Sequence, residues 1–334
     1  MPFRSGFVCI LGRPNAGKST LLNALVGEKL AIISPKPQTT RNRIQGVVHV
    51  AKRKGKNTKN GGQIVLIDTP GVHRPDSSLG RKMMVEVREA MEGCDLVLVI
   101  MDVARKFDPR DQFALDLLKK SGTKAFLVLN KVDLIREKSK LLPLIEEYRK
   151  LYAFSEVIPI SALKRNGLDD LLEMVIAVLP AGPAYFPEDQ ITDQPARFMA
   201  AEIIREQVLL NTSEEIPYAT TVIVDSFEEG ARLTRIAATI YCEREGQKGI
   251  LVGKGGAMLK KIGTSARLQM ERMLGTKVFL ELYVKAEPGW RDSRRFVEEL
   301  DWRRQLEHRM LEHGRPGGKH GVPVGSAGPN DTSD

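Results

Sequence analysis

The chain has 334 residues, which is enough for two domains that each bury a core of their own. Hydrophobic residues make up 42% and charged residues 28%, the values of an ordinary globular protein and not of a disordered one. The formal net charge of +9 favours a polyanionic partner, either a nucleic acid or an acidic membrane surface.

The cysteines and the apolar runs exclude further classes. Cys9, Cys94 and Cys242 are odd in number, far apart and without C-x-x-C spacing, so neither a disulfide framework nor a zinc site is expected. No apolar run reaches the length of a membrane span, and the first strand begins too early to leave room for a signal peptide. We therefore expect a cytoplasmic protein, with peripheral contact at the cytoplasmic face of the membrane left open.

In the first 180 residues, apolar strand-like runs alternate with helical patterns. This alternation is typical of a mostly parallel sheet covered by helices, and such sheets bind ligands at the carboxyl ends of their strands. The expected strands are 7–11, 44–50, 63–68, 95–101, 124–130 and 156–160, and the expected helices are 18–26, 80–92, 109–120, 139–153 and 167–179.

Helical periodicity ends at Leu179-Pro180, and prolines prevent residues 181–195 from continuing a helix. This segment is interpreted as an ordered linker between a first domain, 1–180, and a second domain, 196–300. Residues 301–334 form a tail that is charged at first and then rich in Gly, Pro, Ser and Asp, a composition that is expected to stay disordered. In the second domain, the expected order of helix, two strands, two helices and a strand covers 196–210, 218–227, 233–243, 246–252, 258–274 and 278–284.

Residues 12–19 match G-x-x-x-x-G-K-[ST], the phosphate-binding P-loop, between an apolar strand and a helical pattern. The glycines allow backbone N–H groups to close around phosphate oxygens, and the N-terminus of the following helix adds positive potential. Lys18 is expected to reach the β- and γ-phosphates, and Ser19 to hold Mg²⁺. The predicted nucleotide-binding residues here are Gly12, Arg13, Pro14, Asn15, Ala16, Gly17, Lys18, Ser19 and Thr20.

A second motif, Asp68-Thr69-Pro70-Gly71, directly follows an apolar strand. A carboxylate at the end of a buried strand suits the orientation of Mg²⁺, and the N–H of Gly71 is able to reach a γ-phosphate because no Cβ intervenes. Taken alone, these residues are also compatible with a plain Pro-Gly turn.

A third motif, N-K-V-D at 130–133, ends another strand. Asp133 is able to accept both the N1–H and the exocyclic amino group of guanine, whereas adenine has the reverse pattern, so the site should reject ATP. The stem of Lys131 would cover the face of the base, and the backbone of the S-A-L segment after the last strand would contact the guanine oxygen. The predicted guanine-binding residues are Asn130, Lys131, Asp133, Ser161, Ala162 and Leu163.

In the second half, Gly253-Lys254-Gly255-Gly256 joins two expected helices. An α-β-β-α-α-β order with G-x-x-G between the helices is typical of a KH domain of the bacterial type. The glycines let an RNA backbone approach closely, so that about four unpaired nucleotides lie along a groove between helix and strand. Lys260 and Lys261 are candidates either for phosphate contacts or for the solvated face of their helix.

Together these segments resemble the Era-type GTPases, a bacterial family with the motifs of translation-factor-type GTPases. The resemblance implies an α/β P-loop GTPase domain of the Ras-like type, with a mostly parallel sheet and flanking helices, followed by an α+β KH domain of type II. It runs from about residue 5 to about residue 298 and is carried by GRPNAGKSTLLNAL, PQTTRNRI, DTPGVH, NKVD and SAL, together with 186–189, 191–193, 197–200, 202–206 and 246–249.

The resemblance also implies the activity and the partner. GTP would be hydrolysed with Mg²⁺ as cofactor, and the KH domain would bind the 3′ end of small-subunit (16S) ribosomal RNA in the 30S precursor. A mobile loop at 37–41 would close on the γ-phosphate, and the resemblance assigns Thr40 rather than Thr39 as its Mg²⁺ ligand. The protein is expected to be a monomer. The expected Mg²⁺ ligands are Ser19, Thr40 and Asp68, and the expected catalytic groups are Lys18, Thr40 and Gly71.

Three positions decide details of the chemistry. Ras-like proteins have a water-orienting glutamine directly after the glycine of D-x-x-G, but Val72 neither donates nor accepts a hydrogen bond, so slow intrinsic hydrolysis is expected. His73 is either a catalytic residue or an ordinary loop residue. Asn15 either helps to hold K⁺ near the β/γ bridge, as in related GTPases, or only stabilises its loop.

The chain departs from the family in a basic connection at 52–62. This connection is either a solvated hairpin tip or an added finger that contacts phosphates. A rival hypothesis, a GTPase of tRNA modification, lacks any visible modifying domain. A second alternative is a GTP-dependent RNA-binding scaffold in which the nucleotide is mainly structural, and Val72 favours it.

Overall fold

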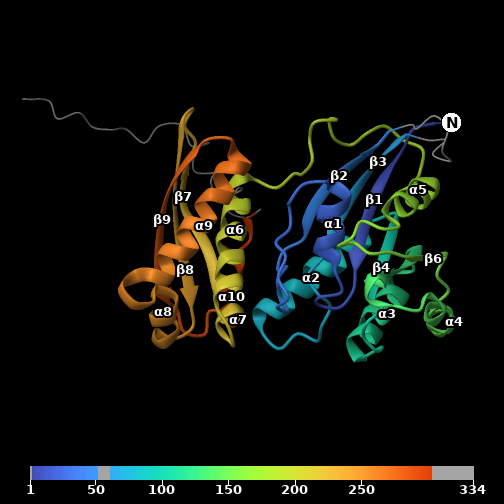
Figure 1. Cartoon of the computed structure of the whole chain (residues 1–334), viewed down its shortest axis with the longest axis horizontal. Helices are drawn as coiled ribbons and strands as arrows, with labels where there is room; N and C mark the ends of the chain where they lie inside the picture. Colours follow the sequence, from blue (N-terminus) through green and yellow to red (C-terminus); the bar gives the residue numbers. More distant parts are fainter. Residues whose placement is uncertain (1, 52–60, 303–334) are drawn as a thin grey trace, which may run out of the picture.

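The structure is a computed structural model, and it describes residues 2–51 and 61–302. Figure 1 shows two lobes, one built around strands β1 to β6 and the other around β7 to β9, joined by an extended segment. The predictions for residues 52–60 of the basic connection and for 303–334 of the tail fall outside the described residues. Within the described part, no helix is long and apolar enough to cross a bilayer.

The first lobe contains a six-stranded sheet in the order β2-β3-β1-β4-β5-β6. All neighbouring strands are parallel except β2, which runs antiparallel to β3. The strands are β1 (Arg4–Leu11), β2 (Ile44–Val50), β3 (Gly62–Asp68), β4 (Leu96–Asp102), β5 (Ala125–Asn130) and β6 (Glu156–Pro159). The helices are α1 (Lys18–Val26), α2 (Ser78–Glu92), α3 (Pro109–Ser121), α4 (Leu141–Leu151) and α5 (Leu168–Val178).

Helices cover both faces of this sheet because its strands are apolar on both sides. Along β1, Val8 and Ile10 pack in a core shared with α1 and α5, whereas Cys9 and Leu11 pack in a core shared with α2, α3 and α4. Strands buried on both faces read as continuous apolar runs, which is the pattern that the sequence shows. The expected α/β fold with a mostly parallel sheet is confirmed.

Several element limits differ from the sequence predictions by one to three residues, and two of them have a local reason. β1 begins at Arg4, earlier than the apolar run, because Arg4 and Ser5 already pair with Gly62 and Gln63 of β3. α2 begins at Ser78, because the Ser77 side chain caps it and accepts from the N–H of Gly80 at 3.0 Å.

The predicted linker, 181–195, forms no helix or strand but is pinned to the first sheet. The fully buried side chain of Gln63 accepts from the N–H of Tyr185 at 2.7 Å and donates to the carbonyl of Phe186 at 2.7 Å. Further along, Val47 N donates to Ile191 O at 2.8 Å. The segment is therefore ordered along β2 and β3 before it reaches the second lobe.

The second lobe contains a three-stranded sheet in the order β7-β8-β9, with β7 and β8 antiparallel and β8 and β9 parallel. α6 and α9 pack on this sheet around one apolar core. The expected KH fold is confirmed. The strands are β7 (Thr221–Glu228), β8 (Leu233–Cys242) and β9 (Lys277–Ala286), and the helices are α6 (Ala196–Asn211), α7 (Ile216–Ala219), α8 (Glu245–Val252), α9 (Ala257–Leu274) and α10 (Arg294–Glu299).

One prediction in this lobe is wrong, because the strand expected at 218–227 begins only at Thr221. The residues before it form the short helix α7. Pro217 lies in its first turn, where the missing N–H costs nothing, and Tyr218 and Ala219 both donate to the carbonyl of Glu215.

Candidate functional site

The P-loop connects β1 to α1, and its Gly17 lies against Asn130, the last residue of β5. Gly17 caps α1 at φ +102°, a conformation that residues with a Cβ rarely adopt, and a Cβ there would lie 2.2 Å from Asn130 Nδ2. A cavity of about 230 Å³ opens over this loop. Its lining includes the predicted nucleotide-binding residues Pro14, Asn15, Gly17, Lys18, Ser19, Thr20, Gly71 and Lys131, and also Thr39 and Thr40.

Lys18 lines this cavity with only 5% of its surface exposed. Its Nζ donates to Gly12 O and Arg13 O, both at 3.0 Å. Burial lowers the pKa of Lys18 to about 8, although the negative charge of Asp68 opposes that shift. A phosphate group beside this buried ammonium would be attracted to it strongly, because little water screens the pair.

Three oxygen-bearing side chains converge at one end of the cavity. Ser19 Oγ lies 2.6 Å from Asp68 Oδ2 and 2.8 Å from Thr40 Oγ1. The other carboxylate oxygen, Asp68 Oδ1, is buried without a hydrogen-bond partner in the described part of the chain. Thr39 does not join the cluster, since its hydroxyl donates to Lys36 O at 2.6 Å. Mg²⁺ prefers hard oxygen ligands of this kind, so Ser19, Thr40 and Asp68 fit the ion.

The pH dependence of Mg²⁺ binding tests this assignment. Burial raises the pKa of Asp68 to about 6, although Lys18, Ser19 and Thr40 oppose the shift. Mg²⁺ needs the ionised carboxylate, so protons compete with it as the pH falls through 6. We expect the Mg²⁺ affinity of the GDP complex to fall about fivefold between pH 6 and pH 5 through this group alone.

A Mg²⁺ titration with a fluorescent GDP analogue at each pH measures the effect. The Asp68→Asn variant keeps the shape of the side chain but does not titrate, so it shows only the pH dependence of the phosphates. Identical pH profiles for the wild type and this variant would contradict the assignment.

Asn130 joins the P-loop to the loop after β6. Its buried Nδ2 donates to Ala16 O and its Oδ1 accepts from Ala162 N, both at 2.9 Å. Ser161, which is also fully buried, accepts from Lys164 N through its hydroxyl. The side chains of Asn130 and Ser161 therefore bond to the backbone of the loops that carry the predicted base-binding residues.

Lys131 and Asp133 lie nearer the surface than the buried Asn130 and Ser161. Lys131 Nζ donates to Asn15 O at 2.9 Å and pairs with Asp102 at 2.7 Å, which stretches its stem over the P-loop. Asp133 is exposed in the short helical turn Val132–Leu134, where a base edge is able to reach it. Leu163 is 72% exposed, so its predicted contact is one of the backbone. Sequence reasoning missed Asp102, although a carboxylate at the end of the buried strand β4 was a usable signal.

Arg13 is predicted among the nucleotide-binding residues, but its side chain is buried away from the cavity. It pairs with Asp111 at 2.8 Å and with Asp108 at 3.2 Å, at the N-terminus of α3. Only the backbone of Arg13, and not its side chain, is therefore placed to contact a phosphate. The motif gave no sign of this ion pair because the two partners are distant in the sequence.

The residue after Gly71 turns inward. Val72 is fully buried in the core under α2, and its N–H donates to Gly12 O at 3.1 Å. Its side chain is therefore out of reach of any attacking water. His73 Nδ1 lies 2.9 Å from Gly71 O, and its Nε2 is buried without a hydrogen-bond partner among the described residues.

Asn15 holds the loop at 27–43, called the Thr40 loop below. The residue has φ +64°, and its Nδ2 donates to Pro35 O at 2.6 Å. This contact favours the loop-stabilising interpretation of Asn15. A K⁺ ion would need its other amide atom, Oδ1.

The predicted G-x-x-G loop lies beside a groove in the second lobe. Gly253, Gly255 and Gly256 have φ of +72°, +59° and +80°. A cavity of about 390 Å³ between α9 and β9 has an apolar floor with basic side chains, which suits unpaired bases and their phosphates. Lys254 and Lys261 are exposed but lie outside its lining. The lining residues are Gly256, Leu259, Lys260, Gly263, Thr264, Arg267, Leu280 and Leu282.

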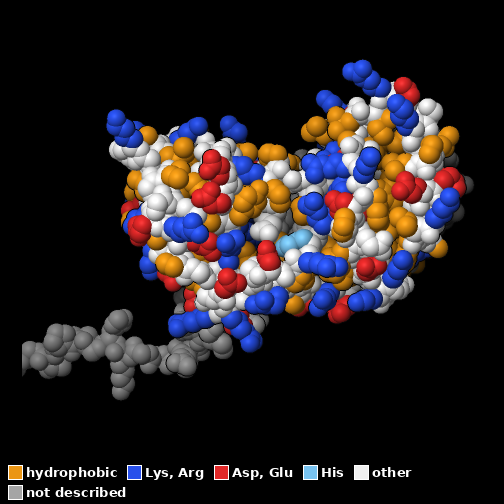
Figure 2. Space-filling model, turned by 90° about the horizontal axis from the view of Figure 1, so that it is seen from below, with side chains coloured by type: hydrophobic (Ala, Val, Ile, Leu, Met, Phe, Trp, Pro, Cys, Tyr) orange, Lys and Arg blue, Asp and Glu red, His pale blue; other side chains and the backbone are white. Residues whose placement is uncertain are grey.

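The two lobes contact each other through the Thr40 loop and through the segment before α10. Lys36 Nζ donates to Leu209 O and Thr212 O at the end of α6. Trp290 is fully buried in the core under α2, and its Nε1 donates to Ala219 O at 2.9 Å. Figure 2 shows a hollow between the lobes, with lysine and arginine side chains on the surface of both.

Comparisons with known proteins agree with this architecture. Residues 7–131 match the 50S ribosome-binding GTPase family, and residues 215–291 match the KH domain family. GTPase Era of Syntrophus aciditrophicus is 49% identical over 302 residues, which are 90% of this chain and 95% of that protein. GTPase Era of Geobacter metallireducens is 51% identical over 303 residues, which are 90% of this chain and 98% of that protein.

Two solved structures are similar over nearly the whole chain. A variant of Aquifex aeolicus Era bound to GDP and AlF4− has a TM-score of 0.83 at 39% identity, and the match covers 89% of this chain and 98% of that one. Era in complex with MgGDPNP and nucleotides 1506–1542 of 16S ribosomal RNA has a TM-score of 0.83 at 40% identity, with the same coverage.

The fold and the site together define a P-loop GTPase joined to a KH domain. The chain belongs to the Era family of GTPases, as the motifs predicted, and as a member it hydrolyses GTP to GDP and phosphate.

Proposed function

We propose that this GTPase binds the 3′ end of small-subunit (16S) ribosomal RNA through its KH domain and acts in assembly of the 30S subunit under the control of GTP. The observation that carries the proposal is the direct bonding of the Thr40 loop to the KH domain. The complex of Era with MgGDPNP and 16S ribosomal RNA supports this choice of nucleotide and RNA.

GTP would act as a switch through the loops that carry Thr40 and Gly71. Both loops close on the γ-phosphate, where Mg²⁺ supplies positive charge to the phosphate oxygens. Because the Thr40 loop bonds to α6 and α7, closure fixes the KH domain in the position that exposes its groove, and GDP reverses this. The coupling is reciprocal, so RNA binding favours the GTP state.

RNA binding measured in three nucleotide states tests the switch. We expect an RNA that ends in the small-subunit 3′ sequence to bind more tightly with a non-hydrolysable GTP analogue than with GDP or without nucleotide. Crosslinking should place unpaired nucleotides against the loop at 253–256 in the GTP state. Equal RNA affinities in all three states would overturn the proposal.

The groove itself is tested by salt dependence. Replacing Lys254 and Lys260 with alanine removes two candidate phosphate contacts and should reduce the slope of log K against log salt by about 1.4. The matched control is Lys277→Ala, an exposed lysine at the start of β9, which follows the end of α9 that lies away from the G-x-x-G loop. It should leave the slope unchanged. A double variant with the wild-type slope would place the RNA elsewhere.

A scaffold function is the second candidate, because the burial of Val72 leaves no side chain at that position to orient water. We propose instead that hydrolysis is slow in the free protein and rises when RNA orders the loops. Single-turnover hydrolysis with and without the RNA separates the two hypotheses. A rate that RNA does not change would favour the scaffold.

Potassium, the membrane surface and the oligomeric state complete the proposal. Asn15 would hold a K⁺ ion through Oδ1, since its Nδ2 donates to Pro35 O, and equal turnover in KCl and NaCl would exclude that role. We propose a cytoplasmic monomer, and the net charge of +9 supports a peripheral contact with an acidic membrane surface. Co-sedimentation with anionic vesicles tests that contact.

A further inference from the structure

The segment Glu202-Ile203-Ile204-Arg205-Glu206 of α6 places three charged side chains inside the protein. Glu202 is 6% exposed, Arg205 2% and Glu206 2%. Burying a charge is costly unless it is paired, so three buried charges within five residues need a structural reason. The nucleotide pocket and the RNA groove use none of them.

In Figure 1, α6 lies on the side of the second lobe that faces the GTPase domain. Glu206 and Arg205 reach that domain directly, and Glu202 pairs with Arg205. Glu206 pairs with Lys29 at 2.6 Å and accepts from the N–H of Ile33 at 3.2 Å. Arg205 Nη2 donates to the carbonyl of Thr39. The segment therefore contacts the Thr40 loop at its start and at the residue next to Thr40.

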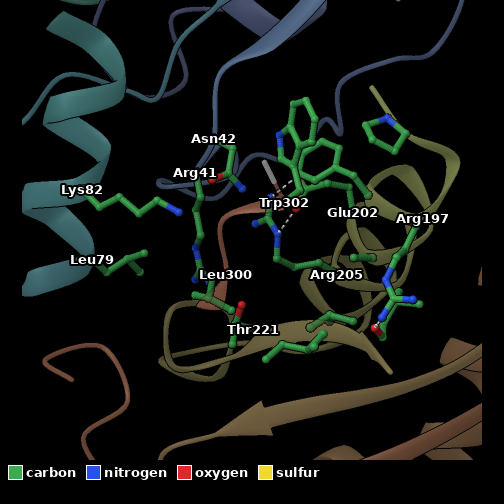
Figure 3. Close-up of a pocket in the computed structure, with 16 residues that line it drawn as sticks. Arg41, Asn42, Leu79, Lys82, Arg197, Glu202, Arg205, Thr221, Leu300 and Trp302 are labelled. Carbon is green, nitrogen blue, oxygen red and sulfur yellow. Dashed lines mark hydrogen bonds and ion pairs between the residues drawn. The ribbon is translucent and has the colours of Figure 1, made fainter. Parts of the chain in front are cut away.

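Glu202 fixes the orientation of Arg205. The two side chains form a bidentate pair, with Nε 2.8 Å from one carboxylate oxygen and Nη2 2.6 Å from the other. Figure 3 shows this pair beside Arg41 in the cavity between the domains. Because both carboxylate oxygens of Glu202 bond to it, the Arg205 guanidinium is already oriented to donate to the carbonyl of Thr39.

Arg41, the residue after Thr40, also bonds to the KH domain. Arg41 Nη1 donates to Thr220 O at 2.7 Å, and its guanidinium carbon lies 5.5 Å from the ring centre of Trp290. The peptide 39–41 is thus bonded to the KH domain on both sides of Thr40. Between these two contacts, Thr40 Oγ1 lies 2.8 Å from Ser19 Oγ.

We propose that Arg205 is a positioning residue for Thr40, so that the KH domain completes the metal site of the GTPase domain. Thr40 is a ligand of Mg²⁺ only when a triphosphate is bound, whereas Ser19 and the P-loop also take part in binding GDP with Mg²⁺. Arg205 therefore favours GTP over GDP from outside the nucleotide pocket. The inference rests on the proposed switch and names the bond through which it acts.

The Arg205→Gln variant of the full chain tests this role. With Mg²⁺ and without RNA, its affinity for a non-hydrolysable GTP analogue should fall about tenfold, the loss expected for a hydrogen bond from a charged donor. Its affinity for GDP should stay unchanged. The matched control is Arg197→Gln on the same helix, since Arg197 donates to Val224 O and Asp225 O within the KH domain, and both affinities should stay unchanged there.

A double-mutant cycle shows whether Arg205 acts through Thr40. In a Thr40→Ala background, Arg205→Gln should cause no further loss of analogue affinity. In the wild-type background, Arg205→Lys should lose less analogue affinity than Arg205→Gln, because the lysine keeps the positive charge. An additional tenfold loss in the Thr40→Ala background, or an equal loss for GDP and the analogue, would overturn the inference. These measurements contain no RNA, so a failure of nucleotide to change RNA affinity would count against the proposed switch and not against this bond.

Discussion

The Gly17→Ala variant should bind GDP at least about a hundredfold more weakly than the wild type. Gly17 has φ +102°, where an alanine is strained, and its new Cβ would lie 2.2 Å from Asn130 Nδ2. The side chain of Asn130 bonds to both Ala16 and Ala162, so displacing it disturbs the P-loop and the loop after β6 together. Equilibrium binding of a fluorescent GDP analogue measures the loss.

Gly27→Ala separates the clash from the backbone strain. Gly27 ends the same helix at φ +89°, but nothing lies within 4 Å of the position that its Cβ would take. This variant should lose stability only, by about 1 kcal/mol, and keep the GDP affinity of the wild type. If both variants bound GDP equally well, the close contact between Gly17 and Asn130 would not be what forces glycine at position 17.

Motifs that depend on neighbouring residues were predictable from the sequence. The P-loop, Asp68 and the N-K-V-D motif each follow an apolar run, and the structure brings all three to one edge of the sheet. Parallel strands buried on both faces force this arrangement, since their carboxyl ends meet at that edge. The short helix α7 was missed because β-branched and apolar residues follow it without a break.

Contacts between distant residues were not predictable in the same way. The motif marks Arg13 and Asn15 as neighbours of a phosphate, but their side chains bond to Asp111 and Pro35. Arg205 stands in a helix with no motif of known chemistry, and its role depends on a carbonyl that the fold brings to it. Local sequence gives the residue type and the element, while the partner is set by how the two domains pack.

Asp133→Asn should exchange guanine for xanthine as the preferred base. The carboxylate is the predicted acceptor for two N–H groups of guanine, and an amide would turn a donor towards one of them. We expect GDP affinity to fall about a thousandfold, because one bond to a charged acceptor is replaced by a contact between two donors and the other keeps only a neutral acceptor. XDP affinity should rise because xanthine offers a carbonyl in place of the amino group. Competition binding with both nucleotides measures the exchange.

The side chain of Asp133 is exposed, so this substitution should not disturb folding. Asp116→Asn is the matched control, since Asp116 is an exposed carboxylate on α3 that bonds to Gln112 and has no place in the cavity. It should bind GDP like the wild type and reject XDP. An Asp133→Asn protein that still prefers GDP would mean that another group reads the base, and the predicted role of Asp133 would then be wrong.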